Sequence, residues 1–381
     1  MTSAKVTVGY QDGCLHPLWL STTGMRMATL LGANAIWLPD HFMGFAPKWM
    51  WRPEVVPVAK VVHSMDALFD PIVLATTAAR RHRRAWIGTS VTDPIRRHPM
   101  SLAQTFVTLD HLSRGRAILG IGNGLRENTE PYGLPADRRV GRLEEALEII
   151  RMLWASGGEP VTFAGRYWQL KDAVFDLPLY RNRPPRLFVG AHFPRMLALC
   201  GRYADGWLPG QKVTGEEYAA RLTIIREAAS AAGRTFDDFL PTQTMLVAFG
   251  ADQEHVIRRA VQNEYCAYMA LGVPPARWAE LGKRHPLGED FAGFTEIVPS
   301  RVTREQVADA LRQLDAALVR EIFYLGTPEQ IAAEAAPLAA AGCRHFILAN
   351  MGALFMKSGA GDLWRMGRLI RTLKRLEAPA P

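Results

Sequence analysis

The sequence predicts a single (β/α)8 TIM barrel of the α/β class, because short apolar runs alternate with longer segments of helical periodicity along most of the chain. A chain of 381 residues that is 48% hydrophobic can bury a large core and has room for a barrel with long inserted loops. A doubly wound open sheet is the alternative. The first predicted strand is not followed by the G-x-G-x-x-G turn of a dinucleotide-binding fold, which favours the closed barrel.

The individual elements follow from the spacing of the apolar residues. Helical segments separate most of the strands, which indicates parallel βαβ units, and closure into a barrel is the economical arrangement for them. The predicted strands cover residues 6–10, 35–38, 85–91, 117–122, 186–191, 206–209, 244–249 and 345–350. The predicted helices cover residues 18–31, 143–154, 218–232, 254–271 and 328–341.

Three long segments interrupt this repeat. Residues 42–70, rich in Trp, Met and Pro, follow the second strand, residues 123–141 follow the fourth, and residues 273–303 precede the last. In barrels the active site lies at the C-terminal ends of the strands, and long loops there are commonly lids or binding loops. We therefore expect one domain over residues 1–381, with inserted loops at that face and an insertion at about 273–325.

Composition and charge exclude several classes of protein. No apolar run approaches about 18 residues and the first residues contain no apolar leader, so we expect a cytoplasmic protein without a membrane span. The four cysteines lie far apart without paired spacing, which predicts buried or incidental thiols and neither a disulfide framework nor a metal site. The net charge of +8 suits an anionic small ligand rather than nucleic acid, because no basic run is interleaved with aromatic residues.

Candidate catalytic residues occur where the second predicted strand ends. Asp40 and His41 stand at that end, from which the catalytic residues of barrels project. Histidine exchanges protons near neutral pH, and an adjacent carboxylate can orient it. A pair that caps the loop by bonding backbone groups is the alternative.

Small and polar residues end the next two strands. Such residues leave room for a planar ring to approach the backbone, and alternating glycines also permit unusual dihedrals. An ordinary strand end and a tight turn are the alternatives. The residues are Ser90, Val91 and Thr92 after the third strand, and Gly122, Asn123 and Gly124 after the fourth.

The loop after the fifth strand has the features of an anion site. It opens a helix, whose first free N–H groups suit a phosphate, and basic side chains nearby could add charge. In the loop after His41, Trp49 and Trp51 are candidate substrate contacts, with packing as the alternative. The candidate phosphate residues are Gly190, Ala191, His192, Phe193, Arg195 and Lys212.

Taken in order, these motifs resemble those of the luciferase-like flavin and deazaflavin oxidoreductases. The residues that carry the resemblance are PDHF at 39–42, IGTSVTDPIRRHP at 87–99, SRGRAILGIGNG at 113–124 and FVGAHFPRMLALCGRYADGW at 188–207. The segment GTPEQIAAEAAPLAAAGCRHFIL at 326–348 is similar to the last helix and strand of that family. Within the family, RAILGIGNG and ENTEPYG in 116–133, FDLPLYR at 175–181 and HPLGEDFAG at 285–293 most resemble the mycobacterial phthiodiolone dimycocerosate ketoreductases.

The resemblance implies a cofactor and the residues around it. It implies the deazaflavin coenzyme F420, with FMN as the alternative, and a non-prolyl cis peptide at Ser90–Val91 behind the ring. It also implies that Asp40 and His41 face the ring, and that residues 190–194 with Lys212 receive the phosphate. Dimers are common among such barrels, so a homodimer is a further expectation.

One departure from the family pattern bears on the substrate. Glucose-6-phosphate dehydrogenases of this type have a Glu directly after the strand-four glycines, whereas this chain has Leu125 there, with Glu127 nearby. Leu125 and Glu127 are therefore further candidate substrate contacts. A less polar substrate is therefore expected, such as a lipid-like ketone, with hydride moving between ring C5 and a carbonyl or alcohol carbon. In this hypothesis His41 donates the proton to the alkoxide, and Asp40 orients it or balances its charge. The alternatives are an FMN-dependent two-component monooxygenase and a non-catalytic flavin-binding protein of the same fold.

Overall fold

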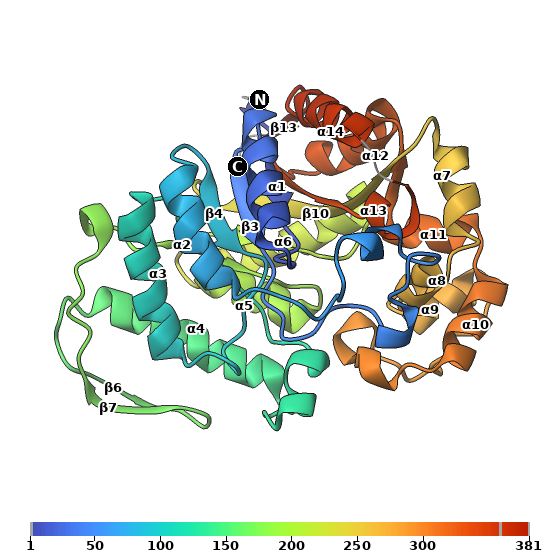
Figure 1. The fold of residues 1–381 in the computed structure, drawn as a ribbon. Helices are drawn as coiled ribbons and strands as arrows, with labels where there is room; N and C mark the ends of the chain where they lie inside the picture. The colour runs from blue at the N-terminus through green and yellow to red at the C-terminus, as the bar shows by residue number, and fades with distance from the viewer. Residues whose placement is uncertain (1–2, 358–359, 380–381) are drawn as a thin grey trace.

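Parallel strands pair side by side until the last one returns to the first, so the sheet closes into a barrel (Figure 1). The barrel strands are β2 (Thr7–Gln11), β3 (Ala35–Leu38), β4 (Trp86–Thr89), β5 (Ala117–Ile121), β8 (Arg186–Val189), β9 (Gly206–Trp207), β10 (Leu240–Phe249) and β12 (His345–Asn350). The β9–β10 and β12–β2 pairings complete the ring. The computed structural model describes residues 3–357 and 360–379, and it confirms the predicted barrel.

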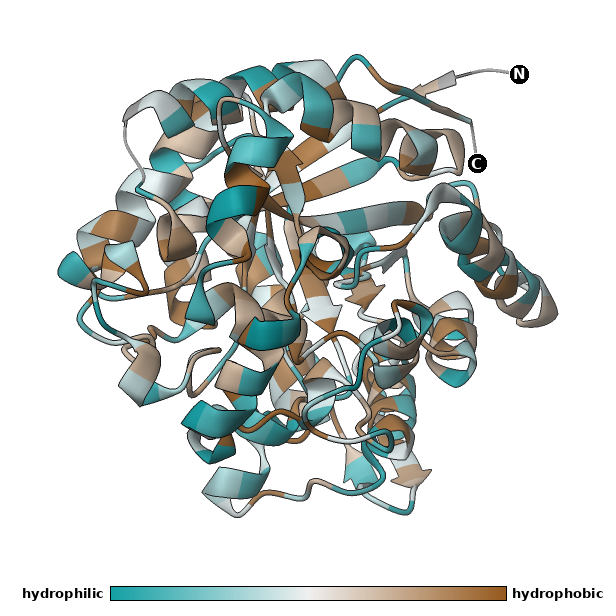
Figure 2. Cartoon of the chain, turned by 90° about the vertical axis from the view of Figure 1, so that its right-hand side faces the viewer, coloured by the Kyte–Doolittle hydropathy of each residue, from teal (hydrophilic) through white to brown (hydrophobic). Residues whose placement is uncertain are grey.

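Helices surround the barrel, and most of them carry both polar and apolar residues, while the central strands are mainly apolar (Figure 2). Local capping residues mark where these helices begin. The Asp70 carboxylate accepts the N–H groups of Ile72 and Val73, at 2.8 and 3.1 Å. Thr214 forms a capping box with Glu217. The surrounding helices are α1 (Leu18–Leu30), α2 (Pro71–Arg81), α3 (Pro99–Ser113), α4 (Arg139–Ala155), α5 (Pro194–Tyr203), α6 (Gly215–Ala231), α12 (Pro328–Ala340) and α14 (Ala360–Leu373).

The predicted helix at 254–271 is wrong as a single element, because it divides into α7 (Gln253–Ala260) and α8 (Glu264–Ala270). Asn263 lies between the two helices, and its Oδ1 accepts two N–H groups from the first turn of α8, at 2.9 and 3.3 Å. A side chain that caps the next turn competes with continuation of the preceding helix. Asn263 Nδ2 also donates to the carbonyl of Val55 at 2.8 Å, which positions α8 against the loop after β3.

Large side chains fill the inside of the barrel. Trp37 on β3 and His345 on β12 meet there, and Trp37 Nε1 donates to His345 Nε2 over 3.0 Å. Burial lowers the pKa of His345 to about 3, so its imidazole stays neutral and can accept this bond. Gly9 and Gly88 face the indole, and a Cβ on them would lie 2.5 and 2.6 Å from it. This filled interior leaves the C-terminal ends of the strands as the place for a ligand.

The segment between β10 and β12 lies to one side of the barrel and packs against the loop after β3 (Figure 1). Met50 and Val56 of that loop share a buried cluster with Tyr265 and Trp278. The two regions are therefore one packed unit. The elements of the segment beyond α7 and α8 are α9 (Pro275–Glu280), α10 (Arg304–Gln313), α11 (Ala316–Ile322) and β11 (Tyr324–Gly326), which extends the sheet beside β10.

Two strand pairs lie outside the barrel. β1 (Ser3–Lys5) pairs antiparallel with β13 (Glu377–Pro379), so the two ends of the described chain lie together (Figure 1). β6 (Val161–Ala164) and β7 (Gln169–Ala173) form a projecting hairpin that the sequence did not predict. Across residues 3–357 and 360–379, no helix has both the length and the apolar composition needed to cross a bilayer.

Candidate active site

The C-terminal ends of neighbouring strands bring predicted site residues together. The peptide bond between Ser90 and Val91 is cis, which confirms the expectation for the end of β4. Val91 lies between two glycines: a Cβ on Gly122 would be 2.8 Å from Val91 Cγ2, and one on Gly190 would be 3.6 Å from it. The ends of β4, β5 and β8 therefore share a surface with little side-chain bulk.

The loop after β5 turns toward His41. Asn123 is half-buried, and Gly124 has a φ of +82°, in the left-handed region that glycine enters without a Cβ clash. Leu125 follows in extended backbone and leads into the 3-10 helix η3 (Arg126–Asn128). This turn carries two polar side chains of η3 to His41 at the end of β3.

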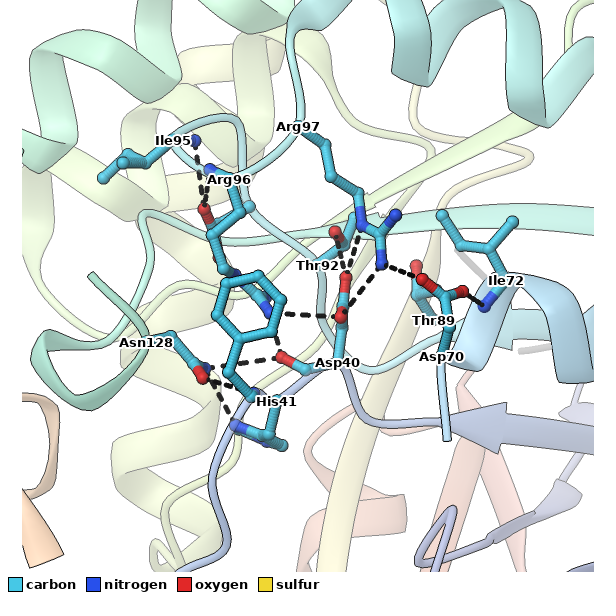
Figure 3. A network of polar contacts seen from close by, with 12 residues as sticks. Asp40, His41, Asp70, Ile72, Thr89, Thr92, Ile95, Arg96, Arg97 and Asn128 are labelled. Atoms are coloured by element: carbon cyan, nitrogen blue, oxygen red, sulfur yellow. Dashed lines mark hydrogen bonds and ion pairs between the residues drawn. The ribbon is translucent and has the colours of Figure 1, made fainter. Parts of the chain in front are cut away.

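His41 is held by these two side chains. Its Nδ1 lies 2.9 Å from Glu127 Oε1 and 3.0 Å from Asn128 Nδ2. Asn128 Oδ1 accepts the N–H of Phe42 at 2.8 Å, which turns Nδ2 of the amide toward the imidazole (Figure 3). Within residues 3–357 and 360–379, Nε2 has no hydrogen-bond partner, and the His41 side chain is 11% exposed. Nε2 is therefore the nitrogen open to a substrate.

The carboxylate of Asp40 points away from His41 and toward two arginines (Figure 3). Its Oδ2 accepts Thr92 Oγ1 at 2.6 Å and Arg97 Nε at 2.9 Å, and its Oδ1 accepts Arg96 Nη1 at 3.1 Å. Burial alone would raise the pKa of Asp40, but Arg96, Arg97 and Thr92 hold it below its usual value. The expectation that Asp40 orients His41 or balances its charge is wrong, because its oxygens serve other donors.

Arg96 is the centre of this buried ion network and was not among the predicted site residues. Its side chain is 2% exposed, with Nε donating to Asp93 Oδ2 at 2.5 Å and Nη2 to the carbonyl of Asp40 at 2.7 Å. Arg97 extends the network to Asp70, at 2.7 Å. The available signal was the pair of arginines in the loop between β4 and α3, since buried guanidinium groups need anions. The network ties the ends of β3 and β4 together.

Glu127 is the buried carboxylate that contacts His41, with a side chain only 1% exposed. Burial raises the pKa of Glu127, although His41 and Arg96 act in the opposite direction. Glu127 stands two residues after Leu125, the position where the resembling sugar-phosphate dehydrogenases have an acid. The sequence predicted Glu127 only as a candidate substrate contact and assigned it no acid–base role. Its contact with His41 depends on the turn after β5 and could not be predicted from the sequence.

The structure contradicts the expectation that Lys212 receives a phosphate. Its Nζ donates to the carbonyls of Arg320 at 2.6 Å and Phe323 at 2.8 Å, and pairs with Glu334 Oε1 at 2.5 Å. An ammonium group has three N–H donors, and these three acceptors use them. Lys212 therefore fastens the loop after β9 to the end of α11, and a phosphate would have to displace a partner.

The rest of the predicted phosphate loop lies between β8 and α5. Ala191 is buried and its carbonyl accepts Trp207 Nε1 at 2.8 Å, whereas Phe193 is 59% exposed. Phe193 is also the residue before α5, and in the described part of the chain no side chain caps that helix. Arg195 is exposed and pairs with Glu144 at 3.0 Å. The first N–H groups of α5 are thus open to an anion.

Trp49 and Trp51 hold the loop after β3 in place. Trp49 Nε1 donates to the carbonyl of Val302 at 3.3 Å, and Trp51 Nε1 donates to that of Val62 at 2.6 Å. Both side chains pack against the buried cluster of this region. These contacts support packing for the two tryptophans, which was the alternative to substrate contact.

Aromatic rings line the rim next to His41. Phe45 packs edge-on against the imidazole with centroids 4.3 Å apart, and Phe294 lies 4.9 Å from Phe45. Phe42 and Tyr132 form a second pair at 4.8 Å, and both are nearly half exposed. We call these four residues the aromatic rim. It gives the surface beside the His41 imidazole an apolar character.

The fold and these strand ends define a class of protein, the barrel oxidoreductases. The chain belongs to the luciferase-like monooxygenase family, whose sequence pattern matches residues 23–345. Over 367 residues it is 39% identical to a phthiodiolone/phenolphthiodiolone dimycocerosates ketoreductase of Mycobacterium kansasii, covering 95% of this chain and 99% of that one.

Two further matches concern proteins described as F420-dependent. A glucose-6-phosphate dehydrogenase of Microbacterium testaceum with that description is 34% identical, across 61% of this chain and 65% of its own. An F420-dependent secondary alcohol dehydrogenase, solved in complex with an F420–acetone adduct, has the same fold. That structure has a TM-score of 0.73 and 20% identity, and the match covers 97% of this chain and 99% of that one.

Proposed function

We propose that the protein is an F420-dependent oxidoreductase that reduces the carbonyl group of an apolar, lipid-like ketone. One observation carries the proposal: Nδ1 of His41 lies 2.9 Å from the buried carboxylate of Glu127, and Nε2 has no hydrogen-bond partner in the described part of the chain. The relative named as a ketoreductase supports the carbonyl substrate. The relative described as F420-dependent supports the cofactor.

The surface around Val91 fits a flat ring. Ser90, Val91, Gly122 and Gly190 would hold it through backbone and aliphatic contacts, because the two glycines add no side chain there. When bound, the deazaflavin supplies the hydride at its ring C5. The net charge of +8 also suits the polyanionic tail of F420.

His41 would supply the proton that completes carbonyl reduction. As imidazolium it keeps Nδ1–H bonded to Glu127 and gives the Nε2 proton to the substrate oxygen, where negative charge develops. Glu127 is buried, so its carboxylate stabilises the imidazolium with little screening by solvent. Asp40 and Arg96 fix the strand ends on which these groups stand, and so fix the distance over which the proton moves.

The apolar substrate class follows from the approach to His41. The aromatic rim lies beside its imidazole, and Leu125 stands where an acid would contact a sugar phosphate. Contact between aromatic or aliphatic surface and a hydrocarbon chain is favourable because it removes apolar surface from water. Such a surface offers no hydrogen-bond partner to sugar hydroxyl groups. A ketone with a long aliphatic chain fits this surface better than a sugar does.

Titration of the purified protein with F420 and with FMN should show tighter binding of F420. Long-chain ketones should then reoxidise reduced F420 faster than acetone does, and glucose 6-phosphate should not reduce F420. Tighter binding of FMN, with oxygen consumption when a flavin reductase supplies reduced flavin, would instead identify a monooxygenase. Binding of F420 without turnover of any ketone or alcohol would identify a binding protein.

Replacing Glu127 with glutamine should lower turnover and change the pH dependence of stability. Glutamine can still accept Nδ1–H but cannot balance an imidazolium. The pKa of Glu127 is raised in the folded protein, so its contribution to stability is present at low pH and is lost as pH rises through the folded pKa. Thermal melts should therefore show the Tm of Glu127→Gln rising relative to that of the wild type as pH increases above the usual range of a glutamate pKa.

Glu130→Gln is the matched control, three residues away. Glu130 lies on the surface and pairs with Arg126 and Arg301, at 2.6 and 2.7 Å. This variant should keep wild-type turnover. If both variants lose turnover to the same degree, the His41–Glu127 contact has no special part in proton transfer.

A further inference from the structure

A cavity lies in the segment between α9 and α10. Its volume is about 410 Å³, within the usual range for sites that hold a small molecule. The 3-10 turns η6 (Phe294–Glu296) and η7 (Pro299–Arg301) contribute to its lining, and Arg126 of η3 reaches it from the loop after β5. The apolar residues that line it are Leu287, Phe291, Ala292, Ile297, Val298 and Val302.

Two short connections join this cavity to His41. Arg126 lines the cavity, and the next residue, Glu127, lies 2.9 Å from Nδ1 of His41. On the other side, Phe294 belongs to the segment that lines the cavity, and its ring centroid lies 4.9 Å from that of Phe45. Phe45 packs edge-on against the imidazole at 4.3 Å. The cavity and the space beside the imidazole are therefore bounded by the same two segments.

The charged residues around the cavity do not select an ion. Arg126 Nη1 pairs with Glu296 Oε2 at 2.9 Å, and Arg301 Nη1 pairs with Glu130 Oε1 at 2.7 Å. Asp290, the fourth charged residue of the lining, is exposed, so water solvates its carboxylate. An anion would have to compete with carboxylates for both guanidinium groups. The apolar surface is therefore the feature that a ligand can use, and the ion pairs fasten this surface to the loop after β5.

We infer that this cavity holds the aliphatic chain of the substrate while the carbonyl group of the substrate faces His41. The inference rests on the proposed function, which supplies the ketone to which the chain belongs. Each methylene group that leaves water for an apolar site strengthens binding by about fourfold. A chain held in the cavity also restricts the positions of the carbonyl group, so a long ketone should react faster than a short one as well as bind more tightly.

The first measurement is the binding of methyl ketones to the full protein without cofactor, by isothermal titration calorimetry. From methyl hexyl ketone to methyl decyl ketone, the Kd should fall by about two- to fourfold for each added methylene group. A fall of this size supports a site for the chain, and variants then locate it. A Kd that does not change with chain length would overturn the inference.

Ala292→Trp tests whether the chain lies in this cavity. Ala292 is exposed and lines the cavity, so an indole there would fill the space without displacing core side chains. The Kd for methyl decyl ketone should rise by at least about tenfold, the effect of exposing a few methylene groups. Ala279→Trp is the matched control, because Ala279 is an exposed alanine of α9 outside the lining. It should leave the series of Kd values unchanged.

Ala292→Asp gives a second test with a smaller side chain. Its carboxylate would have to lose water when a chain enters the cavity, so the Kd for methyl decyl ketone should rise in this variant too. If neither variant at Ala292 changes that Kd, the chain binds elsewhere and the inference is wrong.

Turnover separates this inference from the proposed function. With reduced F420, kcat/KM should rise from acetone to methyl decyl ketone, and Ala292→Trp should lower it at least about tenfold more for the long ketone than for acetone. An equal loss for both ketones would overturn the role of the cavity. If long ketones bind and are never reduced, the proposed function fails and the cavity keeps its role. If ketones are reduced without any dependence on chain length, the reductase function stands and the inference fails.

Discussion

Replacing His41 with asparagine should lower turnover by about 10²–10⁴-fold, the usual contribution of general acid–base catalysis, and leave the Kd of the cofactor within a few fold. The reason is local. Nε2 is the open nitrogen of an imidazole whose Nδ1 lies against the Glu127 carboxylate, and an alkoxide that forms away from water needs a donor within reach. The measurement is steady-state turnover at saturating reduced cofactor and ketone, with the Kd of the cofactor determined on the same preparation.

His63→Asn is the control for this substitution. His63 is an exposed histidine in the loop after β3, and its replacement should change neither quantity. If His41→Asn weakens cofactor binding and keeps its turnover at saturation, the imidazole only packs against the ring. Near wild-type turnover with unchanged affinity would exclude His41 from the mechanism and leave Glu127 or a bound water as the donor.

Replacing Asp40 with asparagine should lower the free energy of unfolding at pH 7 by about 3–5 kcal/mol, the usual cost of removing one partner from a buried ion pair. Arg96 is 2% exposed and would keep its charge with Asp93 alone to balance it. Chemical denaturation followed by circular dichroism gives the unfolding free energy. Because the ends of β3 and β4 share this network, turnover should fall as well.

The loss of unfolding free energy in Asp40→Asn should become smaller as the pH falls. The pKa of Asp40 is below its usual value in the folded protein, so its stabilisation is present above the unfolded pKa and is lost as pH falls through the folded pKa. The difference between variant and wild type should therefore shrink in acid. A difference that stays constant between pH 7 and pH 3 would show that asparagine acts through packing and not through charge.

Asp12→Asn is the matched control, and its stability difference from the wild type should change with pH in the opposite direction. Asp12 is also buried, but burial raises its pKa because no cation pairs with it in the described part of the chain. Its contribution is present at low pH and is lost as pH rises through the folded pKa. The unfolding free energy of Asp12→Asn should therefore rise relative to that of the wild type from acid to neutral pH. That of Asp40→Asn should fall relative to the wild type over the same range.

The strands and the position of the site could be predicted from the sequence because both depend on local patterns. Apolar runs of strand length, separated by helical periodicity, gave the barrel and placed His41 at a strand end. The cis Ser90–Val91 bond at the adjacent strand end was implied by the resemblance to the luciferase-like family. The partners of those residues depend on the folded chain. Glu127 lies 86 residues from His41 and reaches it only because Gly124 turns the loop after β5.

Two predictions about charged residues were wrong for the same reason. Sequence neighbours were assumed to be partners, so Asp40 was paired with His41, although its acceptors face Arg96 and Arg97. Lys212 was assigned to the phosphate by the family resemblance, yet the carbonyls that end α11 occupy it. A local pattern shows that a charge is present and leaves open which distant group will neutralise it.

The turn after β5 places two tasks on separate residues. Because the carboxylate that supports His41 comes from Glu127, Leu125 takes no part in acid–base chemistry and can be apolar. In the proposed function, the choice of carbonyl compound and the ionisation of His41 thus depend on residues two positions apart. Such a division would let evolution, or an engineer, widen or narrow the range of substrates at residue 125 while the carboxylate at residue 127 is kept.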